Sequence, residues 1–272
     1  MTPRIVLVHG LGRDLHDWDA VVQALADVGQ CEALDLAGFG TEPPPLDGNY
    51  SPGAHARRVA AQLMSGHREP VHLVGNSLGG LVSVLVAAHL PQQVASLTLV
   101  APALPLGGTS AGQLQLAVLG MPGVGGPLIR AGRRQALDRR VQDLLRLTFA
   151  RPEEVPAEQR TRLRSAIEQR DAVPHGDTAL IQTVRGLAGL LWHPGPTRRA
   201  IAGLSMPVVA LYGRRDRLVP VAQAAALRRL APQADVSVLP RAGHLIQLED
   251  PDDVVQAVRR QVLRGVTVED RS

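Results

Sequence analysis

Residues 75–80 read Gly-Asn-Ser-Leu-Gly-Gly, a G-x-S-x-G pattern centred on Ser77. The run before it, residues 71–74, is short, apolar and β-branched, and residues 81–88 stay apolar over a helical length. The pattern therefore predicts a strand, a sharp turn and a helix. Such a turn strains the serine backbone and closes only if the residues two before and two after carry no Cβ. Gly75 and Gly79 meet this requirement, so we expect Ser77 to be a nucleophile rather than a plain helix cap.

The same pattern occurs a second time at residues 108–112, with Ser110 in the serine position. Here the preceding segment contains Pro102 and Pro105, and such a run cannot form a buried strand with a complete hydrogen-bond ladder. The context therefore favours Ser77 over Ser110.

Apolar strand segments alternate with helical segments along much of the chain. Alternation of this kind predicts parallel strands in one sheet with helices on its faces. The fold class we expect is α/β, with a mostly parallel sheet of about six strands and a helical lid inserted after the fourth. The predicted strands are residues 5–8, 31–34, 71–74, 96–100, 208–212 and 236–239, and helices are predicted at about residues 16–28, 51–66, 221–230 and 251–263.

The regular alternation stops after residue 102 and resumes at about residue 205. The interval opens with a Gly- and Pro-rich stretch to Pro127 and continues with helical patterns at 135–148, 157–169 and 178–192. We therefore divide the chain into an α/β core, residues 1–102 and 205–272, and a helical lid (cap), residues 103–204. The lid holds fourteen arginines against eight acidic residues, a pattern typical of solvated helix faces. Its apolar run 186–192 faces either a pocket or neighbouring lid helices.

A serine hydroxyl needs a base to take its proton and a carboxylate to orient that base. In parallel α/β sheets, ligands sit beyond the carboxyl ends of the strands. Asp216 follows the strand at 208–212 and His244 follows the strand at 236–239, so these two are the expected acid and base. Residues 100–103 contain no acid, which leaves Asp216. The remaining histidines other than His9 lie within or beside helices or open a strand: His16, His55, His67, His72, His89, His175 and His193.

Acyl transfer also needs two donors for the oxygen that becomes negative. The backbone N–H of Leu78, at the start of the helix, is one candidate, and the N–H of Leu11 in the turn after the first strand is the other. His9 and Gly10 belong to that turn, and we expect His9 to orient it rather than to act as the base.

These motifs together resemble the α/β-hydrolase-fold serine hydrolases of the lid-bearing esterase type. The resemblance rests on the order Ser77, Asp216, His244, on the HG-x-G turn at residues 9–12, and on the G-x-x-D-x-x-x-P block at 213–220. It covers residues 4 to about 263 and implies acyl-enzyme chemistry, but the lid matches no motif that would name a substrate. The family usually begins with an antiparallel pair of strands, for which only four residues are present before the first strand here.

The expected function is hydrolysis of carboxylic esters with small to medium apolar acyl groups. C–C bond hydrolases of dienoic diketo acids resemble the chain too, although they usually carry Trp where Leu245 follows His244. Lactonase, thioesterase and acyltransferase activities on the same triad stay open. Serine at position 77, where dehalogenases and epoxide hydrolases carry Asp, argues against those two reactions.

Two non-enzymatic readings compete. A dinucleotide-binding module would explain Gly10-x-Gly12 and Asp35, but Leu15 stands where the third glycine belongs. The second is a hydrolase-fold ligand receptor that has kept its triad, which tight binding without turnover would reveal.

Composition and charge argue against several classes of partner and location. The chain has 272 residues, a formal charge of only +4 and 2% aromatic residues, so neither a nucleic-acid partner nor stacking platforms are expected. One cysteine, Cys31, fits a reducing compartment, and no secretory signal or membrane span is recognisable. We expect a cytoplasmic enzyme with a small-molecule substrate and with neither cofactor nor metal. The oligomeric state cannot be read from the sequence.

Overall fold

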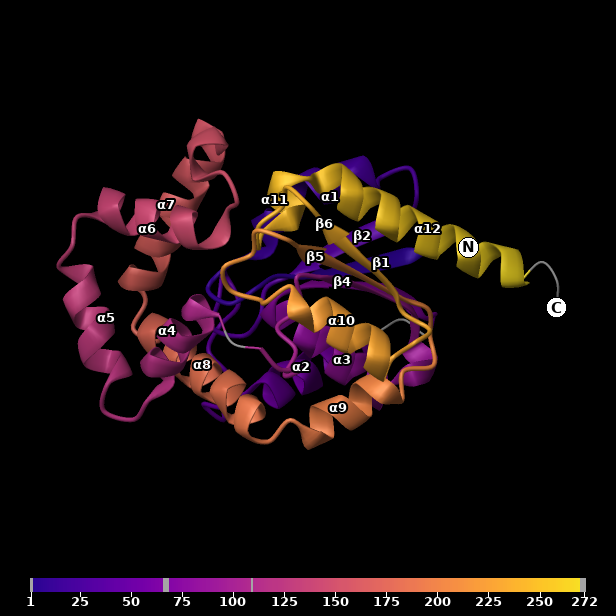
Figure 1. Ribbon diagram of the computed structural model, residues 1–272, viewed down its shortest axis with the longest axis horizontal. Coiled ribbons are helices and arrows are strands. Elements are labelled where there is room, and N and C mark those ends of the chain that lie inside the picture. Colours follow the sequence, from indigo (N-terminus) through magenta and orange to yellow (C-terminus); the bar gives the residue numbers. More distant parts are fainter. Residues whose placement is uncertain (1, 66–68, 109, 270–272) are drawn as a thin grey trace.

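The computed structural model describes residues 2–65, 69–108 and 110–269. Residues 1, 66–68, 109 and 270–272 lie outside this description, among them the expected end of the second helix at residue 66 and both ends of the expected core. Figure 1 shows a sheet between two layers of helices, with a further group of helices beside it.

Six strands form one sheet in the order β2-β1-β3-β4-β5-β6, and all neighbouring strands are parallel. The central strands are apolar and buried, as parallel strands covered by helices on both faces must be. The expected α/β fold with about six parallel strands is therefore confirmed. The strands are Arg4–Val8 (β1), Gln30–Leu34 (β2), Val71–Asn76 (β3), Val94–Val100 (β4), Val208–Gly213 (β5) and Asp235–Leu239 (β6).

Helices cover both faces of the sheet (Figure 1). One layer closes a core around residues such as Leu73, Leu81 and Leu97, and the other closes a core that includes Leu7 and Trp18. Alternate side chains of the strands point into these two cores, which fixes the sheet between the layers. The first layer contains α2 (Pro52–Met64), α3 (Leu78–His89), α9 (Gly195–Ala202) and α10 (Ala222–Leu230), and the second contains α1 (Asp19–Ala24) and α12 (Pro251–Glu269).

The prediction of a helix at residues 16–28 is only partly correct. A 3₁₀ turn, Leu15–Trp18 (η1), comes first, and α1 ends at Ala24. The chain leaves the helix early because Gln30 must start β2 beside β1: its N–H donates to the carbonyl of Pro3 at 2.8 Å. Docking of the strand thus overrides the helical pattern of the side chains.

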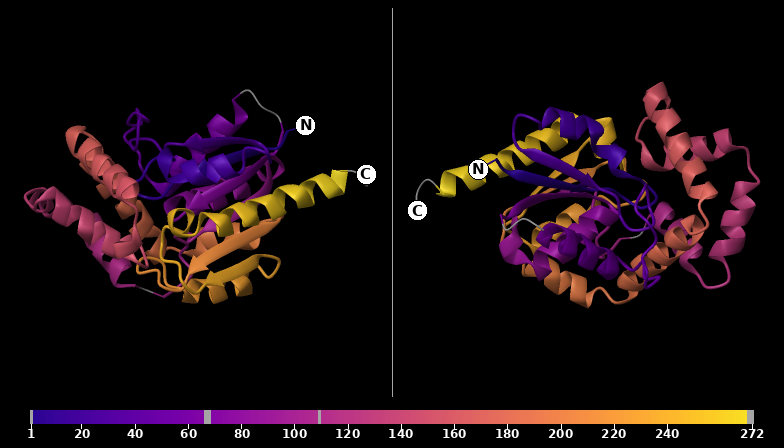
Figure 2. Two further views of the ribbon diagram at one scale, coloured as in Figure 1. Left: turned by 90° about the horizontal axis from the view of Figure 1, so that it is seen from above. Right: turned by 180° about the vertical axis from the view of Figure 1, so that it is seen from behind.

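Between β4 and β5 the described chain forms a group of helices that gathers at the carboxyl ends of the strands (Figures 1 and 2). The three helices expected from the sequence are present as α6 (Leu137–Thr148), α7 (Ala157–Ala172) and α8 (Gly176–Trp192). Two more, α4 (Ala111–Gly120) and α5 (Gly125–Arg133), occupy the Gly- and Pro-rich stretch and were not foreseen. A short 3₁₀ turn (η3, Pro152–Glu154) connects α6 and α7, another (η2, Pro91–Gln93) precedes β4, and α9 packs against α3 in the core layer.

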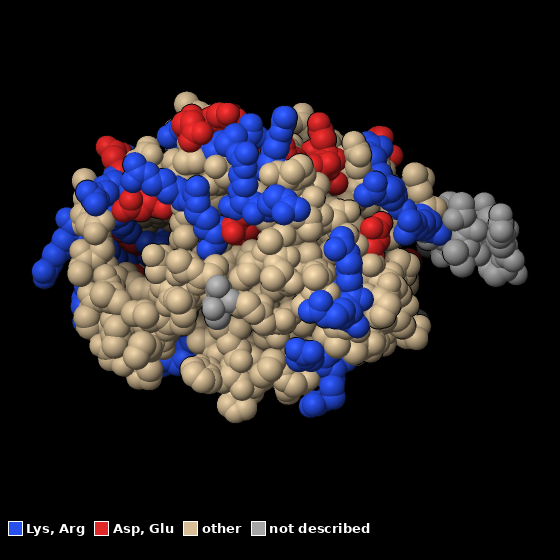
Figure 3. All heavy atoms as spheres, viewed as in Figure 1, with Lys and Arg blue, Asp and Glu red and all other residues tan. Residues whose placement is uncertain are grey.

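Helices α6 and α7 share a small hydrophobic core of their own. Leu145 and Leu163 belong to it, and so does Leu245 from the loop after β6. Basic side chains gather on the surface at the upper left of Figure 3, where these helices lie in Figure 1. Several arginines of these helices are in ion pairs, such as the half-buried Arg140 with Asp171 at 2.6 Å. No helix in the described part of the chain combines the length and the apolar character that crossing a membrane requires.

Candidate active site

Ser77 lies at the turn between β3 and α3. Its backbone has φ 53° and ψ −113°, a region that non-glycine residues rarely occupy. The turn is packed against itself and against β1: a Cβ on Gly75 would collide with the carbonyl of Gly79, and a Cβ on Gly79 would collide with the carbonyls of Val8 and His9. Close packing at the two glycines therefore holds Ser77 in its strained conformation.

Asp216 and His244 come together from the loops after β5 and β6. Nδ1 of His244 lies 2.8 Å from Oδ2 of Asp216, and Oδ1 of the same carboxylate accepts the N–H groups of Leu218 and Val219 at 2.7 and 2.8 Å. A carboxylate at Nδ1 places the ring proton there, which leaves Nε2 as an acceptor in the neutral imidazole.

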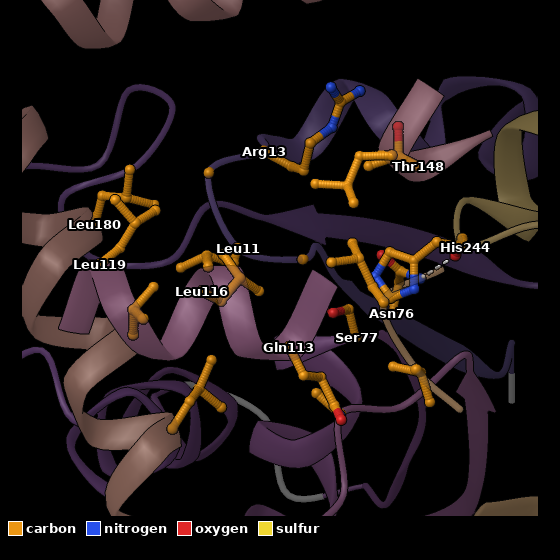
Figure 4. A pocket seen from close by; sticks show the side chains of 18 of the residues that line it. Leu11, Arg13, Asn76, Ser77, Gln113, Leu116, Leu119, Thr148, Leu180 and His244 are labelled. Carbon is orange, nitrogen blue, oxygen red and sulfur yellow. Dashed lines mark hydrogen bonds between the residues drawn. The ribbon is translucent and has the colours of Figure 1, made fainter. Parts of the chain in front are cut away.

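The side chains of Ser77 and His244 line one pocket (Figure 4). Within the described residues no hydrogen bond joins the serine hydroxyl to the imidazole. Catalytic hydrogen bonds are often long or unformed before a substrate binds. The absence of this bond is therefore compatible with proton transfer from Ser77 to His244.

The turn after β1 lines the same pocket beside Ser77, with Gly10 and Leu11 among the lining residues: a Cβ on Gly10 would lie 3.3 Å from the Cβ of Ser77. His9 braces this turn: its Nδ1 lies 2.7 Å from the carbonyl oxygen of Gly10, and its Nε2 accepts the N–H of Leu36 at 3.0 Å. Burial lowers the pKa of His9, so the ring stays neutral. With both nitrogens engaged, His9 is placed to orient the turn and not to accept a proton from Ser77.

Leu78 is the first residue of α3, and the N–H groups of a first helical turn have no acceptor within the helix. The structure thus brings the two expected oxyanion donors, the N–H groups of Leu11 and Leu78, to the neighbourhood of Ser77.

Asn76 is a site residue that the sequence did not reveal. It is fully buried, and its Nδ2 donates to the carbonyl oxygens of Val100 at 3.0 Å and of His244 at 3.2 Å. The side chain thus ties the strand that carries the nucleophile to the backbone of the histidine. Its position in the motif, directly before Ser77, is the signal that could have pointed to it.

Ser110, the serine of the second G-x-S-x-G match, caps α4. Its Oγ accepts the N–H of Gln113 at 3.0 Å and donates to the carbonyl of Leu218 at 2.6 Å. Both contacts give it a structural role at the start of the helix.

The pocket has a volume of about 290 Å³ and an apolar wall. Among its described lining residues only Arg13, Arg170 and His244 can carry a positive charge, and each is paired, Arg13 with Asp17 and Arg170 with Asp171. The described residues hold no group of three or more His, Cys, Asp or Glu side chains that could bind a metal ion. The apolar wall is formed mainly by Leu116, Leu119, Leu144, Leu147, Leu180, Val184, Leu187 and Leu191.

A family model described as alpha/beta hydrolase fold matches residues 3–251. The chain belongs to the α/β-hydrolase fold family. The arrangement expected of that family, a serine on a sharp turn with histidine and aspartate after later strands, is the arrangement described above.

Two curated relatives that match most of this chain differ from each other in their named functions. The dihydrolipoyllysine-residue acetyltransferase component of the acetoin cleaving system from Pseudomonas putida is 33% identical over 257 residues, which are 93% of this chain and 61% of that protein. The pimeloyl-[acyl-carrier protein] methyl ester esterase from Aeromonas hydrophila is 30% identical over 264 residues, 96% of this chain and 95% of the esterase. The chain thus spans only about three-fifths of the first relative, whereas it spans nearly all of the second.

Solved structures support the fold. A meta-cleavage product hydrolase from Pseudomonas fluorescens has a TM-score of 0.77 at 21% identity, covering 96% of this chain and 91% of that one. A lipase-like protein from Acinetobacter baumannii has a TM-score of 0.76 at 23% identity, covering 98% and 85%. At these identities the likeness concerns the fold alone.

Proposed function

We propose that the protein is a serine hydrolase that cleaves carboxylic esters of small to medium apolar acyl groups through an acyl-enzyme intermediate. The observation that carries the proposal is the position of Ser77, strained on its turn at the wall of an apolar pocket that it shares with a His244–Asp216 pair. The relatives named as esterases agree with this chemistry.

In the first half of the reaction, Nε2 of His244 takes the proton of the Ser77 hydroxyl as Oγ attacks the ester carbonyl carbon. The carbonyl oxygen becomes negative and receives hydrogen bonds from the N–H groups of Leu11 and Leu78. Asp216 keeps the imidazole in the required tautomer and stabilises its positive charge. The C–O bond then breaks, and the alcohol leaves with the proton from His244.

In the second half, water attacks the acyl group on Ser77. His244 takes a proton from that water, and the same two N–H groups stabilise the negative oxygen. Collapse of the intermediate returns the proton to Ser77 and releases the carboxylic acid.

The lining of the pocket suits an uncharged acyl chain. Its wall is built mainly from leucine side chains. Arg13 is paired with Asp17, and Arg170 contacts Asp171, a carboxylate that it shares with Arg133 and Arg140. A volume of about 290 Å³ lies at the lower end of the range for small-molecule sites, which fits a short or medium chain. We further propose that the predicted lid, residues 103–204, supplies most of this wall and so sets the substrate.

C–C bond hydrolysis of a diketo acid is the second candidate on the same triad. It would need a cation to bind the substrate carboxylate, and Arg170, which shares Asp171 with Arg133 and Arg140, is the lining residue that could supply one. The apolar wall of the pocket favours ester hydrolysis. Lactones, thioesters and acyl transfer use the same groups and are separated only by assay. The cytoplasmic location stays a prediction from the sequence.

The test is one substrate panel on one preparation. With p-nitrophenyl esters, kcat/KM should rise severalfold for each two-carbon step from acetate to about six or eight carbons, because each buried CH₂ contributes about 0.8 kcal/mol. Ester rates that are flat beyond acetate, together with fast cleavage of a dienoic diketo acid, would reverse the ranking. Tight binding of these ligands without turnover would identify a receptor.

A further inference from the structure

The loop that carries His244 is bonded directly to the end of α6. The N–H of His244 donates to the carbonyl oxygen of Thr148 at 2.9 Å, and the N–H of Leu245 donates to the same oxygen at 3.4 Å. Thr148 is the last residue of α6, so its carbonyl has no partner within the helix. The histidine backbone thus completes the hydrogen bonding of a helix that lies far from it in sequence.

Glu249 joins the same two segments a second time. Its Oε1 accepts the N–H of Gly243 at 2.9 Å, and its Oε2 accepts the N–H of Ala150 at 2.8 Å. One carboxylate therefore bridges the residue just before His244 and a residue just after α6. Hydrogen bonds to an ionised acceptor are stronger than those between neutral groups.

The two segments are packed without space between them. A Cβ on Gly243 would lie 2.5 Å from the nitrogen of Ala150 and 2.7 Å from Oε1 of Glu249. Leu245, only 2% exposed, adds its side chain to the hydrophobic core of α6 and α7. A glycine at position 243 is thus required by the approach of the helix end.

The loop of Asp216 is attached in the same way. The guanidinium group of Arg217 donates to the carbonyl oxygens of Arg146 and Phe149, and Ser110 at the start of α4 donates to the carbonyl of Leu218. Both loops that carry the acid and the base therefore rest on the helical segment between β4 and β5.

We propose that residues 146–150, at the end of α6, are a fixed support of the His244–Asp216 pair, and that Glu249 is the positioning residue that holds the histidine loop against this support. The inference rests on the proposed function, because it assigns a role to the support of a catalytic base. It implies that this end of the helical segment stays with the core when substrates enter, since moving it would displace His244.

The ionisation state of Glu249 gives the inference a specific readout. Burial and the charges of Asp250 and Asp216 raise the pKa of Glu249 to about 7, against the opposing effect of the N–H donors of Ala150 and Gly243. A protonated carboxyl group turns one acceptor into an O–H donor that faces an N–H group, so one of the two bonds is lost. The support is therefore complete above pH 7 and weakens as the pH falls.

The experiment compares Glu249→Gln with the wild type and with Asp252→Asn, an exposed carboxylate three residues later as the matched control. The glutamine amide can accept only one of the two N–H groups at any pH. We expect kcat of Glu249→Gln on a p-nitrophenyl ester to fall about 10- to 100-fold at pH 8, with KM within about threefold, because displacement of a catalytic group by about 1 Å has effects of this size. Asp252→Asn should match the wild type.

The decisive readout is the ratio of wild-type kcat to that of Glu249→Gln as a function of pH. We expect this ratio to grow from pH 5.5 to pH 8 through a midpoint near 7, because only the wild type loses a proton at position 249 in this range. A ratio that is constant with pH, or close to 1 throughout, would overturn the inference. Counting active sites with a fluorophosphonate removes the contribution of unfolded enzyme.

Arg217→Ala provides a second variant if Glu249→Gln does not fold, because Arg217 is exposed. It should lower kcat about three- to tenfold at unchanged KM, and unchanged kcat would overturn the role of the helix end. Ser77→Ala separates the two claims: if it is inactive while Glu249→Gln keeps full activity, only the present inference fails.

Discussion

Nδ1 of His244 lies 2.8 Å from Oδ2 of Asp216, and the two side chains are only 5% and 1% exposed. Water competes little for a hydrogen bond at this depth, so the carboxylate fixes the tautomer and the orientation of the ring. The pair faces a serine on a strained turn, and the predictions below follow from that geometry.

Replacing Asp216 should leave the fold intact but remove the group that fixes the tautomer of His244. In Asp216→Asn, Oδ1 can still accept the N–H groups of Leu218 and Val219, but the amide no longer holds the proton on Nδ1 of His244. We expect kcat to fall about 10³- to 10⁴-fold, as in other triads. Asp235→Asn, an exposed aspartate at the start of β6, is the control and should be close to wild type. A loss below about tenfold in Asp216→Asn would argue against this acid.

Asn76→Ala should cost both stability and rate. The variant removes the side-chain donor from the buried carbonyl oxygens of Val100 and His244. The Val100 oxygen keeps the N–H of Ser77, and leaving the His244 oxygen unsatisfied costs about 1–3 kcal/mol. We expect Tm to fall by about 4 °C or more and kcat by about tenfold, since the histidine loop loses an attachment. Calorimetry and ester kinetics measure both effects, and an unchanged kcat would show that Asn76 serves the fold alone.

Filling the pocket should shift the chain-length preference. Ala188 of α8 lines the cavity, so Ala188→Phe removes volume from it. We expect kcat/KM on an octanoyl ester to fall at least about tenfold while the acetate rate stays within about threefold. Gly189→Ala is the control, because a Cβ there meets open space. Equal losses on both esters would place the acyl chain elsewhere.

Acid should destabilise the protein between pH 6.5 and 4. Burial lowers the pKa of His9, His55 and His72 from the ordinary 6.5, and that of His55 to about 4. The unfolded chain then binds more protons in this window, so the free energy of unfolding falls as the pH falls. The raised pKa values of Glu249 and Asp253 act in the opposite sense, but they are two groups against three.

The measurement is Tm against pH for the wild type and for His55→Gln. The variant should show a shallower decline between pH 6.5 and 4, whatever its absolute stability. An identical decline in both proteins would mean that His55 does not contribute to the acid sensitivity.

The sequence revealed the strands and the sharp turn at Ser77 because both depend on local patterns. Continuous apolar runs predict buried parallel strands, and the Gly75–Gly79 spacing around Ser77 reflects backbone collisions that any similar turn must avoid. Asp216 and His244 could be found because parallel strands deliver their following loops to one edge of the sheet.

The rest depends on contacts between distant residues. Helix α4 has little amphipathic pattern and is specified by the cap at Ser110 and by packing against α8. Helix α5 is amphipathic, but its glycines and Pro127 are more typical of a loop. Glu249 and Ala150 are 99 positions apart in the sequence, and neither carries a signal of its partner. The partner of Asn76 is likewise distant in sequence, because its amide donates to the backbone of His244, 168 positions away.

The most direct test of the central claim is the pre-steady-state reaction with a p-nitrophenyl ester, followed by mapping of a fluorophosphonate adduct to its peptide. We expect a burst of one p-nitrophenol per active site, an adduct on Ser77, and loss of both in Ser77→Ala, with kcat reduced at least about a thousandfold. Ser110→Ala should keep the burst and change kcat less than about tenfold. An adduct on Ser110, or a full burst in Ser77→Ala, would contradict the assignment of Ser77 as the nucleophile.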